Sequence, residues 1–522
     1  VAEESAETFD AAVQALHVKS YRDKSQAVDK LIQLSHPNTI TILSAFLDSR
    51  LWYKKSDLRV IVIHEKDSVY TAYDAANNTD YGELQKNQIK RIKTNNSLRK
   101  KLRGAIAELS LNNPDASIRL KAVKEMLSKL SDDSIDNLQS ALSREKSPEV
   151  RAALNTAIAL IDINSDDNSR RLQAIRILAD SLLPAALAKL ENLIEKDDDG
   201  NFEETNPEVL ADALIAINKI QSKVDFYNFL ETLFFGISLG SVLLLAAIGL
   251  AITFGVMGVI NMAHGELIMI GAYTTYVVQL LMPNYIDWSI LVAIPAAFIV
   301  AGLFGILIER GVIRFLYGRP LETLLATFGI SLILQQLVRS VFSPLNRSVE
   351  TPGWMSGAWQ INDAFSLTFN RLYIIIFSIL VFLALLSILK KTTLGLQVRA
   401  VSQNRSMAKA LGVRSDWVDA LTFGLGSGIA GVAGVALSQL TNVGPNMGQS
   451  YIIDSFLVVV FGGVGNLWGT LVGALSLGVA NKFLEPWSGA VLAKIFILVL
   501  IILFIQKRPK GLFPQKGRSS EH

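Results

Sequence analysis

The chain has 522 residues, of which 50% are hydrophobic and 19% are charged, and its formal net charge is +3. The apolar excess is typical of a membrane protein, and so small a net charge argues against nucleic-acid binding. The sequence contains no cysteine, which excludes disulfides, cysteine zinc sites and thiol catalysis.

Charged residues are unevenly distributed along the chain. Lys, Arg, Asp and Glu are dense up to about Asp225, whereas residues 229–504 contain repeated apolar runs long enough to cross the hydrocarbon of a membrane. We therefore expect two domains: a soluble domain over residues 1–225, and a membrane domain with a basic tail over residues 226–522.

The first domain shows helical periodicity and an internal repeat. "IRLKAVKEML" from Ile118 aligns with "RRLQAIRIL" from Arg170, and "PEVRAALNTAIALI" from Pro148 aligns with "PEVLADALIAINKI" from Pro207. Blocks of this kind are typical of helical pairs that stack on one another, and they predict a soluble α-helical domain of HEAT-like repeats. A plain helical bundle with an alanine-rich core would produce the same matches.

One segment of this domain departs from the helical pattern. "LRVIVIHEKDSVYTAYD", residues 58–74, alternates β-branched and aromatic residues around a polar "EKDS" turn. This pattern predicts a small β-hairpin inserted into an otherwise all-α fold.

The second domain contains repeated apolar runs of membrane-spanning length. About eight such runs, the expected membrane passages, are residues 233–253, 264–282, 288–308, 321–342, 372–389, 420–439, 452–480 and 489–505. The seventh run is interrupted by "FGGVGNLWG", residues 461–469, whose glycines weaken a continuous helix. With a break there, the seventh run could cross the membrane twice, and the domain would have about eight or nine passages. An additional crossing would place the basic tail on the same side of the membrane as the other basic clusters.

Clusters of Lys and Arg orient these passages, because such clusters stay in the cytoplasm. The clusters follow the third, fifth and last runs, and comprise Arg310, Arg314 and Arg319, then Lys390, Lys391, Arg399, Arg405, Lys409 and Arg414, then Lys507, Arg508, Lys510, Lys516 and Arg518. Counting back through three passages predicts that the N-terminal domain is extracytoplasmic.

Polar residues inside the apolar runs are candidates for a solute pathway, because such residues usually face a protein interior or a water-filled cavity. The candidates are Asn261, His264, Glu266, Tyr273, Gln335, Gln336 and, at the glycine-rich break, Gly462, Gly463 and Asn466. For His264 and Glu266 the alternative is hydrogen bonding to neighbouring helix ends at the cytoplasmic edge, and for the glycine-rich break it is close helix packing.

His264 and Glu266 do not form a simple metal site. On a helix, His264 shares a face with Asn261, whereas Glu266 points away from His264 by about 200°. His264 is also the only histidine within the apolar runs, so we expect no metal site.

Three stretches in order resemble one known family. They are "GSVLLLAAIGLAITFGVMGVINMAHGELIMIGAY", "GLQVRAVSQNRSMAKALGVRSDWVDALTFGLGSGIAGVAGV" and "VVVFGGVGNLWGTLVGALSLG", which start at Gly240, Gly395 and Val458. Over residues 229–514 they resemble the permease subunits of bacterial branched-chain amino acid ABC importers. With the preceding extracytoplasmic helical domain, the whole chain resembles the larger permease subunit of the urea importer.

The resemblance implies a polytopic α-helical permease, not an enzyme, in the bacterial inner membrane, with its N-terminal domain in the periplasm. It implies a small polar solute such as urea or a short amide; a branched-chain or other amino acid is the alternative. The expected partners are a second homologous permease in a heterodimer, two ABC ATPases, an extracytoplasmic solute-binding protein and membrane lipid. A stand-alone channel or carrier with a proton relay, and a membrane-anchored sensor, are alternatives from other classes.

Transport driven by ATP would need a partner, because the sequence has no GxxxxGK[ST] loop to hold nucleotide phosphates. We therefore expect no cofactor on this chain, and ATP and magnesium on the ATPases. The resemblance places an ATPase-coupling helix in the loop after the fifth passage, although Ser406 and Met407 stand where the family has an acidic residue. The coupling candidates are Arg399, Arg405, Met407, Ala408, Lys409, Ala410, Leu411 and Gly412.

Overall fold

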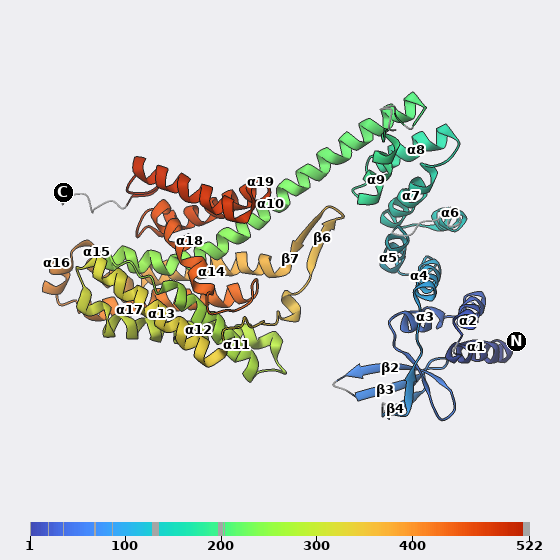
Figure 1. The fold of residues 1–522 in the computed structure, drawn as a ribbon, viewed down its shortest axis with the longest axis horizontal. Helices are drawn as coiled ribbons and strands as arrows, with labels where there is room; N and C mark the ends of the chain where they lie inside the picture. Colours follow the sequence, from blue (N-terminus) through green and yellow to red (C-terminus); the bar gives the residue numbers. More distant parts are fainter. Residues whose placement is uncertain are drawn as a thin grey trace. The chain divides into compact units, whose positions relative to one another are not determined.

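The computed structural model divides into two compact units, Val1–Val224 and Asp225–His522, and the division falls inside helix α10 (Pro207–Met257) (Figure 1). The residues that the structure describes are 2–18, 20–34, 36–66, 69–85, 87–127, 135–196, 202 and 204–514.

The first unit is built mainly of helices whose apolar faces meet in three separate clusters. Its helices before α10 are α1 (Ala2–Gln14), η1 (Ala15–His17), α2 (Tyr21–Leu34), α3 (Thr39–Leu47), α4 (Asn96–Ser110), α5 (Ala116–Leu127), α6 (Ile135–Arg144), α7 (Pro148–Asp162), α8 (Asn168–Leu178) and α9 (Pro184–Leu193). Figure 1 shows α5, α7 and α8 following one another in space.

Arginines at equivalent positions of two aligned sequence blocks form similar buried ion pairs. Arg119, on α5, donates to both carboxylate oxygens of Glu145 at 2.7 Å, and Glu145 lies three residues before the proline that begins α7. Arg171, on α8, donates through one nitrogen to one oxygen of Glu204, which lies three residues before the proline that begins α10. The internal repeat is therefore visible in the contacts as well as in the sequence, while the HEAT-like class stays a prediction.

The first unit also contains a five-stranded antiparallel sheet, so the expectation of an all-α fold with one hairpin is wrong in this part. The strand order is β4-β3-β2-β1-β5, formed by β1 (Leu51–Lys54), β2 (Val60–Lys66), β3 (Val69–Asp74), β4 (Asp80–Leu84) and β5 (Ile89–Arg91). The predicted hairpin is the β2–β3 pair, although Asp67 and Ser68 of its turn lie outside the described residues. The other three strands have five residues or fewer, too short for an alternating pattern to stand out.

The second unit is a helical membrane unit with one short β-hairpin. Its elements after α10 are α11 (His264–Leu281), α12 (Ile286–Gly311), η3 (Ile313–Leu316), α13 (Pro320–Phe342), η4 (Gly353–Met355), β6 (Ala358–Asn362), β7 (Phe365–Thr368), α14 (Phe369–Lys391), α15 (Thr393–Gln403), α16 (Arg405–Ala410), α17 (Ser415–Ser438), α18 (Met447–Gly462) and α19 (Leu467–Lys507).

Among the described residues, six helices are long and apolar enough to cross a membrane: α10, α12, α13, α14, α17 and α19. Helix α18 is apolar but has only 16 residues, and the early polar residues of α11 reduce its hydropathy. Helix α19 has 41 residues and is kinked at Gly489, where φ is 77°. Each arm of α19 is roughly 30 Å long, enough to cross hydrocarbon, so the expected passage count stays a prediction.

Helix α17 lies at the centre of this unit, because glycines let its neighbours approach closely. A Cβ on Gly271 of α11 would lie 2.0 Å from the Gly431 oxygen, and one on Gly431 would lie 2.5 Å from the Ala297 oxygen of α12. Such contacts between small residues are typical of packed membrane helices. They position α11, which carries most of the predicted pathway residues.

The three predicted basic clusters come together at one end of the membrane unit. Arg314 pairs with Asp416 at 3.6 Å, and the Arg405 guanidinium lies 4.0 Å from the Tyr317 ring centroid. The tail joins the same end, since Pro514 lines one pocket with Lys390 and Arg399. Figure 1 shows α15 and α16 side by side at that end. Two tail cations of the prediction, Lys516 and Arg518, lie outside the described residues.

Candidate functional site

A buried polar cluster joins α11 to α13. One oxygen of Glu266 accepts hydrogen bonds from the Ser331 hydroxyl at 2.9 Å and from the Gln335 amide nitrogen at 2.7 Å. Ser331 and Gln335 lie one helical turn apart and so present both donors on one face. Glu266 is 1% exposed, and its other oxygen, Oε2, has no hydrogen-bond partner among the described residues. The cluster therefore retains one free acceptor inside the helix packing.

His264 faces a different helix from Glu266. Its Nε2 lies 2.8 Å from the Ala246 oxygen of α10, which makes Nε2 the donor, and its Nδ1 has no partner in the described part of the chain. Asn261 accepts from the Ala263 amide at 3.0 Å, while its own Nδ2 is unpartnered within the described ranges. The two-residue spacing of His264 and Glu266 predicts this divergence.

The remaining predicted polar residues of α11 and α13 divide into two groups. Tyr273 is 3% exposed, packs against Phe342 with ring centroids 4.8 Å apart, and has a hydroxyl with no partner among the residues described. Gln336 is exposed, so only its neighbour Gln335 belongs to the buried cluster.

The glycine-rich break lies apart from this cluster, against the tail. A Cβ on Gly462 would lie 2.3 Å from the Gly469 oxygen, and Gly463 has φ of 107°, which favours glycine. Asn466 caps α19 by accepting from the Gly469 amide at 3.2 Å, and it donates to the Phe513 oxygen at 3.2 Å. These contacts place the break at the basic end of the unit, where α18 turns back into α19.

The predicted coupling residues form a surface on α16 and the turn after it. Met407 and Leu411 are 58% and 78% exposed, and Lys409, Ala410 and Gly412 are exposed with them. Asn404 caps α16 by accepting from the Met407 amide at 2.9 Å. The surface thus presents apolar side chains at the basic end of the unit.

Other coupling candidates hold this surface in place. Arg405 donates to both oxygens of Asp419 at 2.8 and 2.7 Å, a bidentate pair that ties α16 to α17. Ala408 is 2% exposed and packs with Val398, Val401 and Val418. Exposed Arg399 donates to the Leu389 oxygen at the end of α14.

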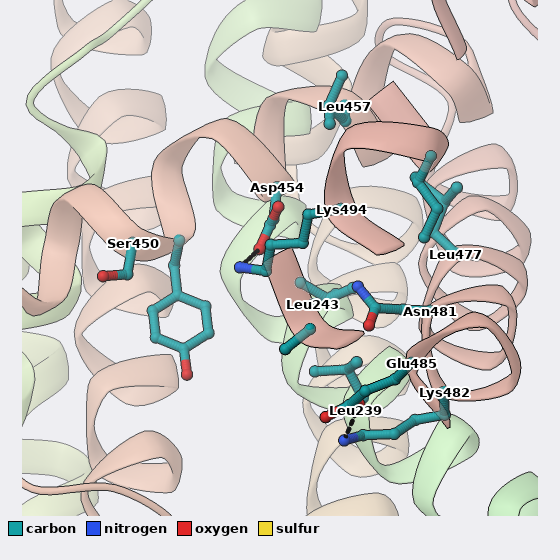
Figure 2. A pocket seen from close by; sticks show the side chains of 13 residues that line it. Leu239, Leu243, Ser450, Asp454, Leu457, Leu477, Asn481, Lys482, Glu485 and Lys494 are labelled. Atoms are coloured by element: carbon teal, nitrogen blue, oxygen red, sulfur yellow. Dashed lines mark hydrogen bonds and ion pairs between the residues drawn. The ribbon is translucent and has the colours of Figure 1, made fainter. Parts of the chain in front are cut away.

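Sequence reasoning missed a charged cavity between α10, α18 and α19. Figure 2 shows Asp454 paired with Lys494, and Lys482 paired with Glu485, along its wall. Asp454 and Lys494 both lie inside predicted apolar passages, so the argument applied to Glu266 would have identified them.

In the described part of the chain, no group of three or more His, Asp or Glu side chains is placed to hold a metal ion. The number of long apolar helices and the buried polar groups between them define the class: a polytopic α-helical membrane protein.

The chain belongs to the family described as branched-chain amino acid transport system, permease component, which matches residues 232–505. Members of this family are the permease subunits of ABC importers. Residues 1–231 lie outside the match.

Curated relatives agree with this assignment. The high-affinity branched-chain amino acid transport system permease protein LivH of Salmonella typhimurium is 34% identical, and LivH of Escherichia coli (strain K12) is 33% identical. BraD of Pseudomonas aeruginosa, a permease protein of the same description, is 32% identical. Each match covers 55% of this chain and 96% of the relative. No solved structure matches the chain.

Proposed function

We propose that this permease passes a small polar solute without net charge, urea or a short amide, across the bacterial inner membrane. The observation that carries the proposal is a set of hydrogen-bonding atoms on and just before α11 that have no partner among the described residues: Glu266 Oε2, Asn261 Nδ2 and the Tyr273 hydroxyl. They include an acceptor, a donor and a group that is both, which are the kinds of hydrogen-bonding group that an amide requires. An amino acid would bring two charges into the same low-dielectric surroundings at a higher desolvation cost.

A branched-chain amino acid is the second candidate solute. It is favoured by the relatives, since LivH of Salmonella typhimurium is described as a branched-chain amino acid permease and is 34% identical over 297 residues. The two candidates make opposite predictions for the same uptake measurement.

We assign the power source to separate ATPases that dock on the α16 surface, with ATP and magnesium bound there and not on this chain. A second homologous permease and an extracytoplasmic solute-binding protein complete the proposed importer. Apolar side chains such as Met407 and Leu411, exposed among cations, suit a groove on a partner.

We place the N-terminal unit in the periplasm. Basic side chains lie in the last turns of α12 and α14, and the positive-inside rule predicts that this end of the membrane unit is cytoplasmic. The membrane unit begins at the opposite end, where Phe235 lies under the Arg371 guanidinium at the start of α14.

Uptake of labelled urea and labelled leucine, in cells with and without this chain, tests the solute assignment. We expect urea uptake to depend on the chain and leucine uptake to be independent of it. The reverse result would favour the amino acid. Solute flux through this chain alone in proteoliposomes, without ATPases, would instead indicate a channel or carrier.

A further inference from the structure

The membrane unit contains a cavity of ≈ 230 Å³ between α10, α18 and both arms of α19 (Figure 2). Its walls combine leucines from three helices, such as Leu243, Leu457 and Leu477, with the polar side chains of Ser450 and Asn481. The volume is below the usual range for drug-sized ligands and suits a small solute.

Two ion pairs line this cavity. Lys494, on the second arm of α19, donates to Asp454 of α18 at 2.9 Å, and Lys482 donates to Glu485 at 2.6 Å within the first arm. Their side chains remain 23–52% exposed, so they reach the cavity surface. Charged side chains are costly in lipid, and those in membrane helices usually face one another or a water-filled space.

The cavity lies toward the end of the unit opposite the basic clusters. Helix α19 begins at Leu467, at the basic end, and its first arm extends roughly 30 Å away from that end to the kink at Gly489. The second arm then runs back toward the basic end. The lining residue Ala490 follows that kink directly. With the basic end in the cytoplasm, the cavity belongs to the extracytoplasmic half.

We infer that this cavity is an outer binding site for a small polar solute without net charge. The inference rests on the proposed importer function. Because each cation is paired with a carboxylate, the four side chains carry no net charge to attract an ion of either sign, and a lone ion would compete with one of the pairs. The Asn481 amide, the Ser450 hydroxyl and the carboxylates provide donors and acceptors, while leucines close the apolar sides.

Cysteine labelling tests the inference cleanly, because the chain has no native cysteine. Ser450→Cys places a thiol at the cavity, and Ser356→Cys places one on an exposed position before β6 as the matched control. The complete transporter, in right-side-out vesicles, is treated with a membrane-impermeant maleimide in the presence of urea, leucine, choline or no solute. Asn481→Cys provides a second thiol at the cavity. If either cysteine variant assembles poorly, labelling of the other still tests the inference.

We expect the cavity thiols to react from outside and to be protected by the transported solute. When the solute concentration is about ten times its dissociation constant, the fraction of cavities without bound solute falls roughly tenfold, and the labelling rate should fall in proportion. Choline, which carries a net charge, should not protect, and Ser356→Cys should react at one rate throughout.

Equal labelling with every solute would overturn the inference. A second result would also overturn it: a cavity thiol that reacts in the isolated chain but is shielded in the complete transporter, with or without solute. The cavity would then be covered by an interface with the second permease. Protection by leucine and not by urea would support the cavity and overturn the urea assignment. Urea uptake with no protection would overturn the cavity alone.

Discussion

Glu266 is the residue whose substitution best separates the proposed roles. Glu266→Gln keeps an oxygen for Ser331 and Gln335, whereas Glu266→Leu strands both buried donors. A stranded buried group costs about 1–3 kcal/mol, roughly tenfold or more in rate or assembly. We expect the glutamine variant to keep much of the uptake per assembled transporter and the leucine variant to lose it.

Two comparisons make the Glu266 experiment decisive. Gln336→Leu changes the exposed neighbour of Gln335 and should leave uptake unaltered. A proton relay predicts instead that Glu266→Gln is as inactive as Glu266→Leu. If both Glu266 variants lower only the amount of assembled transporter and leave the rate per complex unchanged, the residue is structural.

The repeated ion pair gives the first unit a pH dependence. The hydrogen bond from Arg119 is the largest cause that lowers the pKa of Glu145, from 4.5 to about 2. A lowered folded-state pKa stabilises the fold above the unfolded value, so this contribution is complete above about pH 4.5 and is lost as the pH falls toward about 2. Calorimetric unfolding of the purified protein between about pH 6 and pH 3 should show it.

Glu145→Gln should lower the unfolding temperature at neutral pH and flatten its acid dependence. The exposed residue Glu149, in the first turn of α7, supplies the matched control as Glu149→Gln. An equal acid dependence in the Glu145→Gln protein and the unaltered protein would contradict the assigned role of the Arg119 pair.

At the scale of elements, substitutions on α16 and the turn after it can distinguish residues that would dock an ATPase from residues that pack inside the permease. Leu411→Asp and Met407→Asp place a charge on exposed apolar positions and should reduce copurification of the ATPases and uptake, with the permease still folded. Ala408→Asp would bury a charge among Val398, Val401 and Val418, so it should lower the amount of folded permease instead.

Met407→Leu serves as the control, because it keeps an apolar side chain at the same position. Normal ATPase copurification with both aspartate variants would remove this surface as the docking site. The sequence alone treats Ala408 and Ala410 alike; the tertiary contacts distinguish them.

At the scale of the whole molecule, the orientation rests on where the cations gather. Protease added outside intact spheroplasts should remove residues 1–223, whereas tags placed within residues 397–415 should stay protected. The measurement is the extent to which the protease digests the N-terminal unit and the tags in spheroplasts, from which the outer envelope has been removed. As a control, disruption of the inner membrane should expose the tags to the protease. Protection of the N-terminal unit in intact spheroplasts would reverse the assigned topology.

Much of this architecture follows from the sequence alone, because it depends on local or additive properties. Apolar runs indicate membrane helices by length, clustered cations predict their orientation, and the glycines at residues 461–465 interrupt the seventh run where α18 ends. The repeat around Pro148 and Pro207 is likewise readable as a pattern. None of these features requires knowledge of which helices touch.

Only the tertiary structure decided which polar residues meet. Gln335 and Gln336 are equivalent as amides in an apolar run, yet helix packing buries the first beside Glu266 and exposes the second. Asp454 and Lys494 are 40 residues apart, and only the return of α19 beside α18 makes them a pair. The physical reason is that a side chain's surroundings depend on helix rotation and on neighbours distant in sequence, which periodicity within one segment does not encode.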